Sequence, residues 1–290
     1  MAFLTNLING LSLGSVYAII ALGYTMVYGI AKMLNFAHGD IIMVGAYSVF
    51  VTLASGGHIA LACILSIVLC VIMGVVVEKV AYKPLRGSSP LAVLITAIGV
   101  SYLLQSISQL IFGADPKNVT IASLGAVTLF GAKISVSSIV TLVIGAVIMA
   151  ALTVFVKKTR TGRAMVAVSE DKGAAMLMGI NVNKIISVTF AIGSALAAAA
   201  SLFYLMQIPS VEPTLGSMPG IKAFTAAVIG GIGSIPGAMI GGVLLGVIEK
   251  VCLSVPVLAP YTTAVEFGLL IVILLVRPIG LLGKKRREKV

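Results

Sequence analysis

Residues 59–77 read IALACILSIVLCVIMGVVV, an apolar run that contains no charged side chain. An α-helix needs about 20 mainly apolar residues to cross the hydrocarbon core of a bilayer. We therefore predict that Ile59–Val77 spans a membrane. Further runs of similar length and composition are Leu7–Tyr28, Leu91–Phe112, Ser137–Val156, Ile185–Gln207 and Tyr261–Val276. The predicted fold class is all-α, a polytopic bundle of transmembrane helices.

The composition supports a membrane environment. Of the 290 residues, 59% are hydrophobic and 10% are charged, whereas a soluble domain has about 25% charged residues. The 20 Lys and Arg against 9 Asp and Glu give a net charge of +11. In a soluble protein this excess would suggest nucleic acid as a partner. Here the basic residues gather in short segments between apolar runs, so we expect the lipid bilayer as a partner and no nucleic acid.

Two regions are less regular than these six runs. Ile41–Ala54 is too short to span alone and becomes long enough only if Lys32–Asp40 belongs to the same helix, which would then be a broken second helix. Ala223–Ser254 is apolar and rich in glycine, and the sequence GGIGSIPG interrupts it at residues 230–237. This region either crosses twice or forms a re-entrant pair.

The distribution of Lys and Arg predicts the orientation. Most basic residues lie in Glu78–Pro90, in Lys157–Lys184 and in the tail from Arg277 onward. Short loops rich in Lys and Arg are typically cytoplasmic. The pattern predicts an outside N-terminus and a cytoplasmic C-terminus, and hence an odd number of crossings. The chain would cross nine times if 223–254 crosses twice, or seven times if 223–254 forms a re-entrant pair.

The sequence MLNFAHGD at residues 33–40 places polar residues between two apolar runs. Polar groups at membrane depth usually face a cavity or the bundle interior, and a broken helix is tolerated only there. One hypothesis makes this segment part of a translocation path or gate, carried by Asn35, Phe36, His38 and Asp40. The alternative is an ordinary cytoplasmic turn in which Asn35 and Asp40 cap helices.

A cytoplasmic segment at residues 160–181 is predicted to contain a short helix. Ser169 can cap this helix, with Glu170 and Asp171 in its first turn. Gly179 is expected to end it in a left-handed conformation. Such a helix can dock in a groove of a partner protein or lie on lipid headgroups. The predicted small-residue face consists of Ala174, Ala175, Met178 and Gly179.

Small residues in the glycine-rich region suggest close helix packing, because they let backbones approach in lipid. The alternative is a gate or a dimer contact. The residues concerned are Gly230, Gly231, Gly233, Gly237 and Gly241. Glu212, Glu249 and Glu266 lie near the ends of predicted segments, where we expect a solvated or interfacial position. We expect no catalytic residue, no metal site and no cofactor.

Several stretches together closely resemble the LivH-type permease of bacterial branched-chain amino-acid ABC transporters. They span nearly the whole chain in the family's order: NGLSLGSVYAIIALGYTMVY (9–28), LNFAHGDIIMVGAY (34–47), EKVAYKP (78–84), EDKGAAMLMGIN (170–181) and KAFTAAVIGGIGSIPGAMIGG (222–242). The resemblance implies one permease domain over residues 1–290, with an ATPase-coupling loop at about 157–184. In this loop it assigns the coupling contacts to Glu170, Ala174, Ala175 and Gly179. Lys172 and Gly173 depart from the stricter Glu-Ala-Ala pattern of other importers.

The resemblance also implies partners: a second related permease subunit, two cytoplasmic ATPase subunits and a periplasmic substrate-binding protein. The expected function is ATP-driven import of branched-chain, hydrophobic amino acids across the bacterial inner membrane by alternating access. The chain shows no Walker A motif, so ATP hydrolysis is expected on the partners. The alternative is an ion-coupled secondary transporter, for which His38 and Asp40 are the candidate coupling charges.

Overall fold

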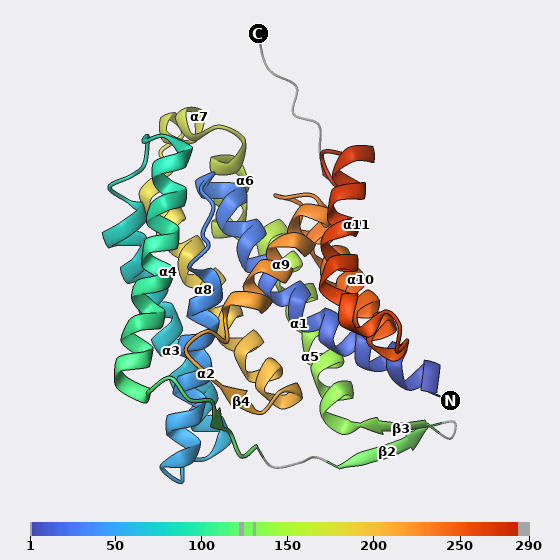
Figure 1. Ribbon diagram of the computed structural model, residues 1–290. Helices are drawn as coiled ribbons and strands as arrows, with labels where there is room; N and C mark the ends of the chain where they lie inside the picture. Colours follow the sequence, from blue (N-terminus) through green and yellow to red (C-terminus); the bar gives the residue numbers. More distant parts are fainter. Residues whose placement is uncertain (1, 122–124, 130–131, 284–290) are drawn as a thin grey trace.

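The computed structural model describes residues 2–121, 125–129 and 132–283, which form a bundle of helices with two small two-stranded sheets (Figure 1). The helices are α1 (Ala2–Ala31), α2 (His38–Ala54), α3 (Ile59–Val77), the π-helix η1 (Glu78–Tyr82), α4 (Pro90–Phe112), α5 (Val136–Lys158), α6 (Arg160–Glu170), α7 (Lys172–Leu177), α8 (Val182–Gln207), α9 (Ser217–Gly230), α10 (Ile235–Ser254), the 3-10 helix η2 (Ala259–Tyr261) and α11 (Thr262–Val276). The strands are β1 (Lys117–Asn118), β2 (Ala126–Leu129), β3 (Ala132–Ser135) and β4 (Ser210–Val211).

Within the described residues, seven helices are long and apolar enough to cross a membrane. Six of them contain the six predicted runs and α10 is the seventh, so the predicted polytopic helical bundle is confirmed. α3 has the predicted limits, Ile59–Val77, and continues without interruption into η1. α2 has 17 residues and is therefore about 25 Å long, short of the ~30 Å hydrocarbon core.

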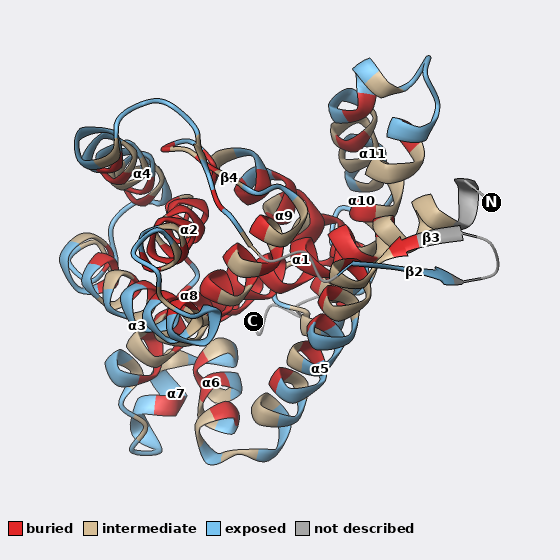
Figure 2. Ribbon diagram, turned by 90° about the horizontal axis from the view of Figure 1, so that it is seen from below, coloured by how far each residue is buried: buried red, intermediate tan, exposed pale blue. Residues whose placement is uncertain are grey.

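α1 lies at the centre of the bundle, with 94% of its most apolar stretch buried. Figure 2 shows most of this helix buried, with intermediate exposure near its N-terminal end, while the outer helices expose many of their residues. Glycines let its neighbour α10 approach closely. A Cβ added to Gly246 would lie 2.2 Å from the Gly14 nitrogen, and one added to Gly14 would lie 2.7 Å from the Val243 Cα. The two helices therefore cross with their backbones in contact.

The glycine-rich region forms two helices, α9 and α10, joined by a tight turn at residues 231–234. A Cβ on Gly230 would lie 1.9 Å from the Gly237 oxygen, and one on Gly241 would lie 2.0 Å from the Ala226 oxygen. Gly231 and Gly233 have φ angles of 105° and 91°, which favour glycine. Gly233 has no neighbouring atom where a Cβ would stand, so its role is conformational.

The two ends of the molecule differ. α6, α7 and the last described residues lie at one end, and the N-terminus and the β2–β3 hairpin lie at the other (Figure 1). β1 pairs antiparallel with β4, with Lys117 opposite Val211. This pairing brings together the segment after α4 and the segment after α8. The basic segment 157–184 lies at the opposite end.

A buried ion cluster connects α1, α9, α10 and α11. The Lys222 ammonium lies 2.9 Å from Glu249 Oε2 and 3.2 Å from Glu266 Oε2. The Tyr17 hydroxyl donates to Glu249 at 2.8 Å. Glu266 is fully buried, so the expectation of a solvated or interfacial position is wrong for it. Because an isolated charge is costly away from water, these side chains stabilise one another on the inner faces of their helices.

We predict that Lys222→Met destabilises the protein by about 3–5 kcal/mol, the usual cost of removing one partner of a buried ion pair. The two carboxylates would then lack their cation. Thermal unfolding in detergent measures the effect. Lys157→Met, at an exposed position, is the control, and adding Glu266→Gln to Lys222→Met should restore part of the loss. An unchanged melting temperature in Lys222→Met would contradict this prediction.

Candidate functional site

The chain between α1 and α2 is non-helical, and it alternates between buried residues (Met33, Asn35 and Ala37) and more accessible ones, of which Lys32 is exposed. α1 ends at Ala31, and Lys32 follows with a φ of 60°, the left-handed conformation that often ends a helix. Residues 32–37 lead to α2, which begins at His38 rather than including them. Asn35 is 2% exposed and Ala37 is fully buried. Asn35 and Ala37 are therefore shielded from solvent by other parts of the chain.

Asn35 and Phe36 hold the segment against two different elements. The Tyr82 hydroxyl, in η1, donates to Asn35 Oδ1 at 2.8 Å. The Phe36 ring lies 5.4 Å from that of Phe224 in α9. The N-cap residue of α2 is Ala37, so the capping role considered for Asn35 is not seen. The contact with Tyr82 instead ties the segment to the end of α3.

His38 and Asp40 point to separate partners. The His38 ring packs at 4.8 Å on Tyr24 of α1, where a Cβ on Gly23 would come within 2.4 Å of His38 Nε2. Asp40 accepts a hydrogen bond from Gln105 Nε2 of α4 at 2.8 Å. Both side chains are 1% exposed. The four residues predicted for the path thus occupy one stretch of chain but contact α1, α4, α9 and η1 rather than one shared cavity.

The start of α2 also touches the start of α9 through backbone. A Cβ on Gly39 would lie 2.4 Å from the Gly216 oxygen, and one on Gly216 would lie 1.9 Å from the Gly39 oxygen. Gln105 reaches Ser217 at 3.2 Å as well as Asp40. A movement of α9 or α4 would therefore change the contacts of the first turn of α2 directly.

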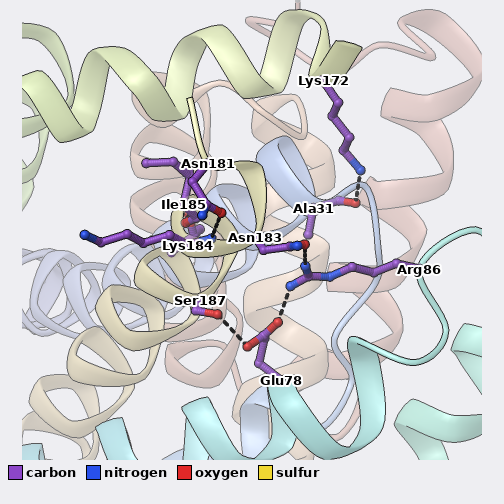
Figure 3. A network of polar contacts seen from close by, with 10 residues as sticks. Ala31, Glu78, Arg86, Lys172, Asn181, Asn183, Lys184, Ile185 and Ser187 are labelled. Carbon is purple, nitrogen blue, oxygen red and sulfur yellow. Dashed lines mark hydrogen bonds and ion pairs between the residues drawn. The ribbon is translucent and has the colours of Figure 1, made fainter. Parts of the chain in front are cut away.

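A polar network lies near the end of the bundle that carries α7 (Figure 3). Glu78 of η1 is fully buried, accepts a hydrogen bond from Ser187 of α8 at 2.7 Å and forms an ion pair with Arg86. Arg86 also donates to Asn183. Sequence reasoning included Glu78 and Tyr82 in the family-like stretch EKVAYKP but assigned no role to them. The sequence did contain a signal for such a role, because Glu78 is an acidic residue directly after the apolar run Ile59–Val77.

The segment at residues 160–181, which we predicted to be cytoplasmic, contains two helices where one was predicted. Ser169 lies in the last turn of α6 and donates to the Val166 carbonyl, so its predicted capping role is wrong. Glu170 is the last residue of α6, not part of a first turn. Asp171 is the N-cap of α7 and accepts from the backbone of Gly173 and Ala174. Because Asp171 is extended, with a φ of −151°, it separates the two helices.

α7 presents an apolar surface. Leu177 is 91% exposed and Met178 is 82% exposed, and Ala174 and Gly179 are also exposed. Ala175 is 4% exposed and packs inward, so it does not share the outer face predicted for it. Gly179 has a φ of 79°, which confirms the predicted left-handed conformation. We call Ala174, Leu177, Met178 and Gly179 the α7 face.

α7 is connected directly to the end of α1. The Lys172 ammonium, in its first turn, donates to the Ala31 carbonyl at 3.0 Å (Figure 3). The last carbonyls of a helix lack intrahelical partners and carry partial negative charge, so a lysine stabilises them. Lys172, which departs from the stricter Glu-Ala-Ala pattern of other importers, thus joins the exposed α7 face to the non-helical segment before α2.

Comparisons with known proteins agree with this architecture. Residues 6–274 match the family model described as branched-chain amino acid transport system / permease component. The chain is 45% identical to the high-affinity branched-chain amino acid transport system permease protein BraD of Pseudomonas aeruginosa, and 43% identical to LivH of Escherichia coli K12. Each alignment covers 99% of this chain and 98% of the relative.

The fold also resembles that of a solved inward-facing metal-chelate type ABC transporter, with a TM-score of 0.54 and 15% sequence identity. That similarity covers 94% of this chain and 88% of the other. Together with its membrane-length helices and nearly full-length matches, this places the chain among membrane proteins of transporter complexes. The chain belongs to the family of permease components of branched-chain amino acid transport systems.

Proposed function

We propose that this chain is the membrane-spanning subunit of an ATP-driven importer that carries branched-chain, hydrophobic amino acids across the bacterial inner membrane by alternating access. The observation that carries the mechanism is the exposed α7 face, joined through Lys172 to the end of the buried α1. The substrate class is supported by the names of the relatives that match over nearly the full length. ATP hydrolysis takes place on partner subunits.

The proposed assembly contains a second related permease, two cytoplasmic ATPase subunits and a periplasmic substrate-binding protein. The N-terminus is outside and the C-terminus is cytoplasmic. This orientation is supported by the basic segment 157–184, which lies at the end of the molecule opposite the β2–β3 hairpin. The ATPases bind the α7 face, because the exposed apolar side chains of Leu177 and Met178 are stabilised when a protein partner covers them.

In the proposed coupling step, movement of α7 is transmitted through Lys172 to the carbonyl end of α1. The next residues lead through Asn35, which Tyr82 holds, to the first turn of α2. A shift there changes the backbone contact between α2 and α9. We propose this segment, with Asn35, Phe36, His38 and Asp40, as the gate of the path between the two permease subunits.

The ion-coupled alternative is less well supported. Ion coupling in the membrane expects charged residues arranged around an ion. Asp40 is instead bonded to Gln105, and His38 packs on an aromatic ring. The other buried charges described are paired as well, Lys222 with Glu249 and Glu266, and Glu78 with Arg86.

We predict that the complex, reconstituted in vesicles with its binding protein, takes up leucine when ATP is supplied to the ATPase side. A proton or sodium gradient without ATP should give no uptake, because no step of the proposed cycle uses it. Radiolabelled leucine uptake measures this. Co-elution of this chain with an ATP-hydrolysing partner is the accompanying control. Gradient-driven uptake without ATP would contradict the proposal.

We predict that Gly179→Trp uncouples transport. A side chain at a positive φ costs about 1 kcal/mol, and the indole would also separate the α7 face from its partner. ATPase stimulation by loaded binding protein should fall while membrane insertion persists. Gly56→Trp is a matched control, since Gly56 also has a positive φ of 81°, has no atoms nearby and lies in the turn between α2 and α3. Equal stimulation in the two variants would exclude the coupling role.

We predict state-dependent access to the proposed gate. Cysteines replacing Asn35 or Phe36, in a background without Cys63, Cys70 and Cys252, should react with a small polar thiol reagent at rates that change when ATP is trapped. Motion of the segment would alter its burial. Ser55→Cys, at the exposed end of α2, should label in every state. Constant, complete labelling at residues 35 and 36 would mark an ordinary turn instead of a gate.

A further inference from the structure

A cavity of about 330 Å³ opens between the end of α1, the turn after η1, the start of α4 and the start of α7. A water molecule occupies about 30 Å³ in the liquid, so the cavity can hold a group much larger than one water. Its lining includes three basic residues, Lys32, Arg86 and Lys172. Among the described residues that line it, none is acidic.

Two of the basic residues that line the cavity, Arg86 and Lys172, have different partners. Arg86 is paired with the buried Glu78, which stands behind the cavity lining. The hydrogen bond described for Lys172 is to a neutral backbone carbonyl, that of Ala31. Burial and the nearby Arg86 charge lower the pKa of Lys172. An ammonium group that is partly desolvated beside a guanidinium is stabilised by an anion.

The start of α4 adds to this positive potential. Ser88 and Pro90 line the cavity, and α4 has 23 residues with Ser89 as its N-cap. The N-terminus of a helix carries a partial positive charge, which favours phosphate and carboxylate groups. Pro90 has no N–H and the Ala92 N–H is bonded to Ser89 Oγ, so the contribution of α4 is its dipole. Side-chain charges and a helix dipole therefore favour an anion at the same place.

The cavity also has an apolar side. Met33, Leu34, Leu85 and Val93 belong to its lining. The outer face of α4 continues from it with Leu91, 64% exposed, and Ile95, 61% exposed. A free phosphate ion would use the basic groups and leave this surface bare. A molecule with an anionic head and apolar chains would use both.

We propose that this cavity binds the phosphate headgroup of an anionic phospholipid, whose acyl chains lie along the exposed face of α4. Basic pockets between transmembrane helices on the cytoplasmic side are suited to such headgroups. The cavity lies where α7 meets α1, the end of the molecule that we propose to be cytoplasmic. The inference concerns lipid binding and is tested without any measurement of transport.

The test uses the purified transporter complex, delipidated and then mixed with dioleoyl phosphatidylglycerol or with dioleoyl phosphatidylcholine. Native mass spectrometry measures the lipid that remains bound. We expect phosphatidylglycerol to be retained in preference. Lys172→Met should weaken its retention roughly fivefold, the effect of about one basic side chain at an anionic surface. Lys172→Arg should retain it, and Lys184→Met, outside the cavity lining, should leave it unchanged.

A second measurement needs no variant. In the wild-type complex, phosphatidylglycerol vesicles should protect Lys172 from amine acetylation, and phosphatidylcholine vesicles should not. Protection by inorganic phosphate as strong as that by phosphatidylglycerol would mark a simple anion site and overturn the lipid assignment. Equal retention of the two lipids, or equal protection by both kinds of vesicle, would overturn the proposal altogether.

Discussion

The backbone contact between α1 and α10 is the constraint on which the rest of the bundle depends. In lipid, helices gain little from burying apolar side chains against one another, so close approach must supply the attraction. Gly14 and Gly246 allow that approach, since neither leaves room for a side chain. α1 is thereby fixed in the centre, and α5, α8 and α9 pack around it. The elements that we propose to move, α7 and the segment before α2, are attached to the end of this fixed helix.

Burial of charge places a second constraint on the structure. Lys222, Glu249 and Glu266 come from three helices, and Glu78 meets Arg86 and Ser187 from two other parts of the chain. Each cluster forms only when several helices are in register. An incorrectly assembled bundle would leave a charge unpaired inside the membrane. These clusters therefore favour one arrangement of the bundle over competing ones, in addition to whatever stability they add.

Sequence alone was sufficient for the spans, because a run such as Ile59–Val77 is determined by local composition and bilayer thickness. It was also sufficient for the left-handed Gly179. Sequence analysis failed where the role of a residue depends on partners that are distant in the chain. Ser169 and Asp171 are both good capping residues, and only the packing of α6 decides that Asp171 caps α7. Glu266 looked solvated or interfacial by its position along the chain, whereas it is buried beside Lys222, which is distant in sequence. Asn35 bonds to Tyr82 and Asp40 bonds to Gln105. Pattern analysis could not identify either partner.

These observations explain why an unusual Lys172 is useful in the α7 segment. Its backbone begins a helix whose outer face is apolar and exposed, and its ammonium reaches the Ala31 carbonyl. The side chain thus satisfies an acceptor that the end of α1 leaves open. A small residue at this position would preserve the α7 face but would lack the hydrogen bond to the Ala31 carbonyl. Movement of a partner bound to the α7 face would then not be transmitted to α1 through this bond. The departure from the Glu-Ala-Ala pattern is therefore consistent with coupling, because Lys172 supplies a connection to the segment before α2.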